Sequence, residues 1–205
     1  MLAGALLSGL AGGIKAEAQD KLAPAARVTY DNKYELYGGP NFMNFQAGQN
    51  EPKRMNMGGM ELLGTYWLTK KVGLGLDFRG DAGSTPVLAN PYVNRPTVEL
   101  FTLMAGAQVR GPKNHYAALN YHGYAGLSHG IFDVSTGGVP AQYANVGLYT
   151  NRTKPMAALG ASVDFNRSKN MAIRIQPDLI LEHFGTETRE FFSISLGVVY
   201  RYGKK

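Results

Sequence analysis

Eleven ionisable residues stand at alternate positions within segments that otherwise carry large apolar side chains. They are six acids, four arginines and one histidine: Glu35, Glu61, Asp77, Arg79, Arg110, His122, Asp164, Arg174, Asp178, Glu182 and Arg201. Residues two apart in a β-strand point to the same face, so these groups would share the face opposite the apolar one. Charges enclosed on such a face must pair, because an isolated buried ion is very costly. The spacing therefore predicts a salt-bridged polar network; a network that rearranges to pass small ions is the alternative.

Catalytic chemistry has weaker support among the same residue types. Asp178 and Glu182 could form a glycosidase-like carboxylate pair, but a filled interior offers no cleft for a sugar. Ser128 and His129 are adjacent, so in a strand they would point to opposite faces and could not act as nucleophile and base. His183 has no serine nearby in the sequence. Because metal-ligand spacings and phosphate-binding glycine loops are also missing, we expect no enzymatic activity, no cofactor and no metal site.

The segment that carries the last of these charges shows the clearest pattern. From 192 to 202 every second residue is large and apolar or aromatic: Phe192, Ile194, Leu196, Val198, Tyr200 and Tyr202. The run has the length that a tilted strand needs to cross a bilayer, about 9–11 residues. Its final tyrosines suit a membrane–water interface. The segment is therefore predicted to be a transmembrane β-strand with one apolar face and one small or polar face.

Earlier parts of the chain repeat this alternation. The further predicted strands are Tyr34–Phe45, Gly58–Thr69, Val72–Asp81, Val98–Arg110, Tyr116–Phe132, Ala157–Asn166 and Met171–His183. Short connections alternate with long ones, which are Gln46–Met57, Ala82–Thr97, Asp133–Met156 and Phe184–Glu190. An even strand number with short turns at one end and long loops at the other is typical of bacterial outer-membrane barrels, in which the short turns are periplasmic and the long loops lie outside the cell. Closure also removes the unpaired edges that lipid cannot tolerate. The prediction is an all-β protein with one eight-stranded antiparallel up-and-down transmembrane β-barrel, in which Pro40 interrupts the first ladder.

Composition agrees with this prediction and narrows the partners. The chain has 205 residues, no cysteine and a net charge of +6. No run of about 18 apolar residues predicts a membrane-spanning helix. The basic residues are scattered rather than gathered into a stripe, which argues against nucleic acid. They fit either solvated turns and loops or contact with anionic lipid headgroups.

The N-terminal region differs from the rest in composition. Leu2 to Ile14 are small and apolar, and Ala16-Glu17-Ala18 has the form of a signal-peptidase site, although a basic start is missing. The expected organisation is a signal peptide at 1–18, with a short amphipathic helix as the alternative, then a lead-in at 19–33 and the barrel at 34–203.

The region 34–203 resembles the eight-stranded OmpA-type barrels. The matching features are the hairpin rhythm and three short motifs: Thr69-Lys70-Lys71-Val72-Gly73-Leu74, Asn170-Met171-Ala172-Ile173-Arg174-Ile175-Gln176-Pro177-Asp178 and Gly197-Val198-Val199-Tyr200-Arg201-Tyr202. The resemblance implies insertion into the bacterial outer membrane by the barrel-assembly machinery, and contact there with lipid and lipopolysaccharide. Two features depart from the family. Gly203-Lys204-Lys205 follows the final aromatic residue, and a peptidoglycan-binding segment is missing, so wall anchoring is not implied.

These observations favour a structural or interaction protein whose loops contact an extracellular partner. The alternatives are a narrow ion pore, a barrel enzyme that modifies lipid A, and a soluble lipocalin-like carrier, whose apolar residues would face inward. The parity of the strands also predicts specific contacts at the turn end of the lumen. Arg201 should be held by Glu35 or Asp164, and Arg174 should join the same cluster.

Overall fold

The strands form one closed barrel in which every neighbouring pair is antiparallel. The structure is a computed structural model that describes residues 28–49, 53–86, 97–132 and 147–204. The strands are β1 Asn32–Phe45, β2 Met55–Trp67, β3 Val72–Ser84, β4 Thr97–Lys113, β5 Ala117–Ile131, β6 Arg152–Asn166, β7 Met171–Glu182 and β8 Arg189–Lys204. They are hydrogen-bonded in chain order, and β1 closes the sheet against β8. The expected signal peptide at 1–18 lies outside the described residues, as does the lead-in before Val28.

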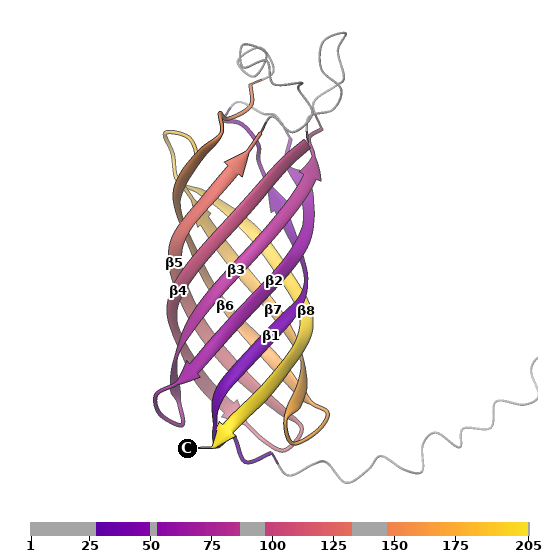
Figure 1. Cartoon of the computed structure of the whole chain (residues 1–205). Coiled ribbons are helices and arrows are strands. Elements are labelled where there is room, and N and C mark those ends of the chain that lie inside the picture. Colours follow the sequence, from indigo (N-terminus) through magenta and orange to yellow (C-terminus); the bar gives the residue numbers. More distant parts are fainter. Residues whose placement is uncertain (1–27, 50–52, 87–96, 133–146, 205) are drawn as a thin grey trace, which may run out of the picture.

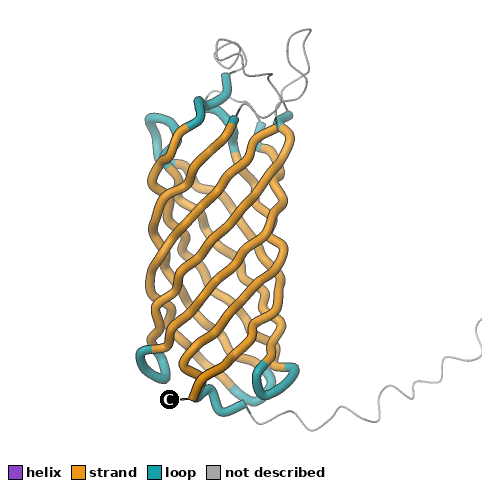
Figure 2. Tube along the Cα trace, in the orientation of Figure 1, coloured by secondary structure: helices purple, strands orange, loops and turns teal. Residues whose placement is uncertain are grey.

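Long and short connections are segregated to opposite ends of the barrel. The connections after β2, β4 and β6 are short, and the strand part of the chain begins and ends at the same end (Figure 1). The strand ends that the longer connections join lie at the other end, and the trace shows strands strongly tilted to the barrel axis (Figure 2). We call these the turn end and the loop end. Among the described residues, no helix could cross a membrane.

Side chains alternate between the lumen and the outside surface along every strand. In β3, Leu74, Leu76 and Phe78 lie outside and are 51%, 57% and 44% exposed. Asp77 and Arg79, at the intervening positions, are 0% and 2% exposed. A soluble protein of this size would bury such leucines, since each loses about 1.5–3 kcal/mol by remaining in water. The exterior is therefore suited to hydrocarbon and the interior to charge.

The strand boundaries differ from the prediction mainly at the loop end. β2 begins at Met55 rather than Gly58, and β6 begins at Arg152 rather than Ala157. Pairing continues there because neighbouring backbones remain close enough to satisfy each other, as between Met55 and Phe45. Pro40 has the limited effect that its missing N–H allows. It pairs in register with Met60 of β2, whereas the ladder between β1 and β8 is interrupted at this point.

Candidate functional site

The middle of the lumen is filled by a group of charged side chains that we call the central cluster. Arg79 on β3 lies 2.8 Å from Asp77, 3.5 Å from Glu61 on β2 and 2.5 Å from Asp178 on β7. His122 on β5 completes the cluster with its Nε2 atom 2.7 Å from Oδ1 of Asp178. Because β3 and β7 are four strands apart in the closed sheet, the contact between Arg79 and Asp178 crosses the lumen. Arg79 therefore has acidic partners on both sides of the lumen.

A second group, the rim cluster, lies nearer the turn end. Arg174 Nε is 2.6 Å from Asp164 Oδ1, and another nitrogen of the same guanidinium is 3.3 Å from Glu35. Arg201 approaches the same two acids, at 2.8 Å from Asp164 and 3.4 Å from Glu35. Arg110 on β4 lies 2.5 Å from Glu35. The structure thus contains the contacts predicted for Arg201 and Arg174, with a fifth member from across the sheet.

Glu182 is buried like the other predicted residues but stands apart from them. It pairs in register with Arg189 of β8 at the loop end. Among the described residues, no ion pair joins it to either cluster. Asp81 is a buried acid that the sequence argument missed, and Nδ2 of Asn41 donates a hydrogen bond to it at 2.9 Å. The signal was available, because Asp81 lies two and four residues beyond Arg79 and Asp77 on the same face.

The loop end of the lumen is apolar, which corrects the expectation of a polar interior. Aromatic rings meet there edge to face or tilted, with centroids 5.1 Å apart for Phe45 and Phe191 and 5.5 Å apart for Phe132 and Phe184. We call the loop-end part of this buried apolar cluster the apolar plug; it includes Met43, Phe45, Met55, Met57, Val98, Leu100, Phe132, Tyr149, Met156, Phe184 and Phe191. The same cluster continues along the lumen through Leu63, Met104 and Tyr124. The outside surface at this level carries polar residues such as Asn56 and Glu190. Where water surrounds the barrel, the apolar side chains turn inward as in a soluble protein.

Tyr30 of the lead-in packs against the turn end of the lumen, although its sequence gave no sign of this. Tyr30 is 6% exposed and lies beneath the rim cluster. Its carbonyl oxygen accepts a hydrogen bond from Arg110 at 3.2 Å, and its hydroxyl donates to the carbonyl of Asn114 at 2.8 Å. The guanidinium of Arg201 lies 5.2 Å from the ring centroid. The backbone of Tyr30 has a φ angle of 55°, which lies in the left-handed region. This conformation is costly for a non-glycine residue, and the contacts of Tyr30 hold it in place.

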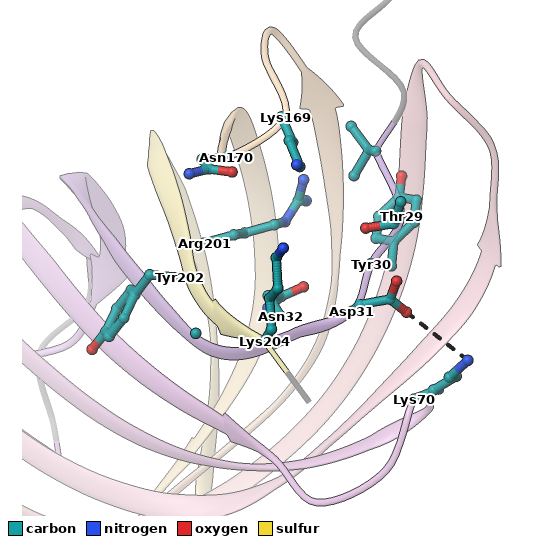
Figure 3. Close-up of a pocket in the computed structure, with 12 residues that line it drawn as sticks. Thr29, Tyr30, Asp31, Asn32, Lys70, Lys169, Asn170, Arg201, Tyr202 and Lys204 are labelled. Atoms are coloured by element: carbon teal, nitrogen blue, oxygen red, sulfur yellow. Dashed lines mark ion pairs between the residues drawn. The ribbon is translucent and has the colours of Figure 1, made fainter.

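Beside this segment the turn end opens into a cavity of about 700 Å³ (Figure 3). Figure 3 shows Lys169 and Arg201 projecting into it, while Asp31 pairs with Lys70 at 3.9 Å. Tyr202 points away from the cavity, towards the outside of the barrel. Among the charged residues of the lining, Lys70, Lys169, Arg201 and Lys204 are basic and Asp31 is acidic.

Comparison with known proteins rests on solved structures alone. No protein-family model and no curated protein matches the chain. Ail, the attachment invasion locus protein of Yersinia pestis, was solved with the heparin analogue sucrose octasulfate; it is 17% identical with a TM-score of 0.55, over 84% of this chain and 99% of Ail. Neisserial surface protein A is 10% identical with a TM-score of 0.55, over 83% and 97% of the two chains. This chain has the fold of the eight-stranded outer-membrane barrels.

A third outer-membrane barrel, OprG from Pseudomonas aeruginosa, is 9% identical with a TM-score of 0.51, over 86% of this chain and 99% of OprG. The predicted fold class and the resemblance to OmpA-type barrels are confirmed. The apolar exterior agrees with the outer-membrane location that this fold indicates. In the predicted orientation, the turn end of the barrel is periplasmic and the loop end is extracellular.

The periplasmic end of the barrel has an aromatic belt on its outside surface. Tyr34 lies with its ring centroid 5.4 Å from Tyr66 and 5.3 Å from Tyr202. Tyr200 and Tyr202 stack at 5.9 Å. Tyrosine is favoured at the membrane–water boundary because its ring is apolar and its hydroxyl is polar. The belt is therefore suited to the boundary of the hydrocarbon at the turn end.

Ser128 and His129, the adjacent serine and histidine of β5, make separate contacts. Ser128 points inward and its hydroxyl lies 2.8 Å from that of Thr102. His129 is exposed on the outside, where its Nδ1 atom lies 2.8 Å from the hydroxyl of Thr153. The two adjacent residues are therefore on opposite faces. In the described part of the chain, no group of three or more His, Asp or Glu side chains could hold a metal ion.

Proposed function

We propose that this protein is a closed outer-membrane barrel that acts through the contacts of its four extracellular loops, rather than by transport or catalysis. The observation that carries the proposal is the obstruction of the lumen at successive depths. The apolar plug lies at the extracellular end, the central cluster in the middle, and the rim cluster with Tyr30 at the periplasmic end. An eight-stranded barrel is about wide enough for side chains to fill.

Energetics favour a lumen that stays closed. A passing ion would have to separate Arg79 from its acidic partners Asp178 and Glu61. The side chains of all three residues are at most 3% exposed. Separating a buried pair costs about 3–5 kcal/mol. The ion would next meet the aromatic rings of the plug, which offer no polar group to replace its hydration shell. A narrow ion pore is accordingly the second candidate and not the first.

The other candidates have less support. A soluble lipocalin-like carrier would keep its apolar residues inside, whereas Leu76 and Leu103 here are more than half exposed on the outside surface. A lipid A-modifying enzyme would need a nucleophile and base in contact, and Ser128 and His129 lie on opposite faces.

A contact function agrees with the placement of charge at the extracellular end. Arg54 and Arg152 lie there, and the guanidinium of Arg189 donates a hydrogen bond to the carbonyl of Gln49 at 2.6 Å, linking the first and last loops. The name of Ail indicates that a protein with this fold can serve attachment. These arginines at the loop end would favour an acidic partner.

Planar-bilayer recording with the purified barrel tests the closed lumen. We expect no reproducible conductance steps from the wild type. A variant with one residue removed at each of the three depths, as Arg79→Ala, Phe191→Ala and Arg174→Ala combined, should produce steps and shows that the assay can detect an open lumen. Regular single-channel steps from the wild type would instead establish the ion pore.

Two cellular measurements test the remaining alternatives. Deletion of the gene should alter survival under envelope stress or adhesion to surfaces, and loops with Arg54 and Arg152 changed to glutamine should reproduce the adhesion defect. The mass spectrum of lipid A should be the same with and without expression. A change in acyl chain number or headgroup would overturn the proposal in favour of an enzyme.

A further inference from the structure

The outside surface of the barrel has a depression near its periplasmic boundary. In the row of the aromatic belt, Tyr34 pairs with Tyr202 on one side and Tyr66 on the other. In the next row towards the membrane centre, Gly64 of β2 pairs with Leu36 of β1 and with Leu76 of β3. A glycine between two leucines leaves the surface one side chain short. The depression therefore lies directly beside the tyrosine belt.

No neighbouring side chain fills the depression at Gly64 in the folded protein. A Cβ atom added there would meet no heavy atom within 4 Å, and a groove of about 340 Å³ extends along this part of the surface. Gly38, also on the outside, differs: a Cβ there would lie 3.1 Å from the side chain of Leu62, so its neighbour already covers it. The groove is lined by Leu36, Gly64, Leu74, Leu76 and the three tyrosines Tyr34, Tyr66 and Tyr202.

A cation stands at the periplasmic end of this groove. The Nζ atom of Lys33 lies 5.8 Å from the ring centroid of Tyr34 and 5.5 Å from that of Tyr66. Among the described residues, the ion pairs do not include Lys33, and the adjacent acid Asp31 pairs with Lys70 instead. An ammonium group at the level of an aromatic belt is at the depth of lipid phosphates. Its charge is available to an external anion.

We propose that the groove is a binding site for one anionic phospholipid of the periplasmic leaflet. One acyl chain lies over Gly64 between Leu36 and Leu76, where it replaces the missing side chain, and the phosphate lies beside Lys33. The barrel exterior is always in contact with lipid, but here a positive charge lies beside two of the tyrosines that line an apolar groove. The site is therefore selective for negative charge as well as for hydrocarbon.

Native mass spectrometry of the detergent-purified barrel tests this site. The barrel is titrated with phosphatidylglycerol or with phosphatidylcholine of the same acyl chains. Phosphatidylglycerol should be retained in preference to phosphatidylcholine. Lys33→Gln should weaken phosphatidylglycerol binding about fivefold, the effect of about 1 kcal/mol for one basic residue near a charged lipid, and should leave phosphatidylcholine unaffected. Gly64→Leu fills the groove and should weaken both lipids. Inorganic phosphate should not compete, because it lacks the chain.

Matched variants separate this site from general effects of charge and shape. Lys169→Gln removes a lysine from the β6–β7 turn, and Gly58→Leu fills another exposed outside glycine with nothing within 4 Å of its added Cβ, at the extracellular end of β2. Both controls should bind phosphatidylglycerol like the wild type. Equal retention of the two lipids, or an equal loss in the controls, would overturn the proposal. Lys33→Gln alone decides the matter if Gly64→Leu fails to fold.

Discussion

Loss of the Asp164 carboxylate should weaken the rim cluster strongly. This cluster contains three guanidinium groups and two carboxylates, and Asp164 accepts from both Arg174 and Arg201, at 2.6 Å and 2.8 Å. Asp164→Asn preserves the shape but leaves Arg110, Arg174 and Arg201 facing Glu35 alone. Breaking one buried pair costs about 3–5 kcal/mol, and two pairs are lost here. We expect the free energy of unfolding to fall by about 5 kcal/mol.

Arg201→Met is the informative comparison. It removes one of the three cations and leaves two guanidinium groups for two carboxylates, with Arg174 still contacting both acids. Its cost should lie near the lower limit for a buried pair, about 3 kcal/mol. Leu196→Val, on the lipid-facing surface with the side chain 51% exposed, should cost less than about 1 kcal/mol.

Urea unfolding in lipid vesicles, followed by the heat-modifiable mobility of the barrel on gels, measures all three variants. The expected order of destabilisation is Asp164→Asn, then Arg201→Met, then Leu196→Val. The reasoning from charge balance is refuted if Arg201→Met destabilises as much as Asp164→Asn. If Asp164→Asn and Arg201→Met both cost as little as Leu196→Val, water reaches the rim cluster and stabilises its charges when a partner is lost.

Three further predictions follow from other parts of the barrel. Gly75→Val should lower stability by about 1–3 kcal/mol in the same unfolding assay, because its first added carbon would lie 2.6 Å from the ring of Tyr124, which stacks on His122; an unchanged midpoint would contradict this. Phe45→Ala in the apolar plug should cost about 3–5 kcal/mol, whereas the outside Phe101→Ala should cost far less; equal losses would show that the plug is loosely packed. An impermeant thiol reagent should label Glu187→Cys on intact cells and Lys169→Cys only after permeabilisation; the reverse pattern would invert the topology.

The alternation of apolar and polar residues alone predicted most of the fold. Because side chains alternate strictly along a strand, a run such as 192–202 specifies both the strand and the face of each residue. The same parity placed Glu35 and Arg201 in one cluster, and these residues are now seen to pair directly across β1 and β8. To predict contacts between adjacent strands, it is nearly sufficient to know which face of the sheet each side chain occupies.

Depth along the barrel axis could not be predicted in the same way. Parity shows that Phe45 and Phe191 share the inner face, but not that water surrounds the barrel at their level and favours an apolar interior. Contacts across the lumen, such as that of Arg79 with Asp178, depend on closure of the whole sheet. Tyr30 lies in a segment without periodicity, so its position under the rim cluster had no signal in the sequence.

The pairing of Glu35 with Arg201 has a consequence for assembly. These residues come from the first and last strands, and they face each other in register only when β1 meets β8. Until β1 pairs with β8, Glu35 has no contact with Arg201. The other members of the rim cluster come from the middle of the chain, and they lack Glu35 and Arg201 at this stage. A partly inserted sheet would expose these charges at its open edges, where hydrocarbon makes them costly. The pairing of β1 with β8 and charge neutralisation are thus a single event, so a barrel with a slipped register would be electrostatically incomplete and prone to reopen.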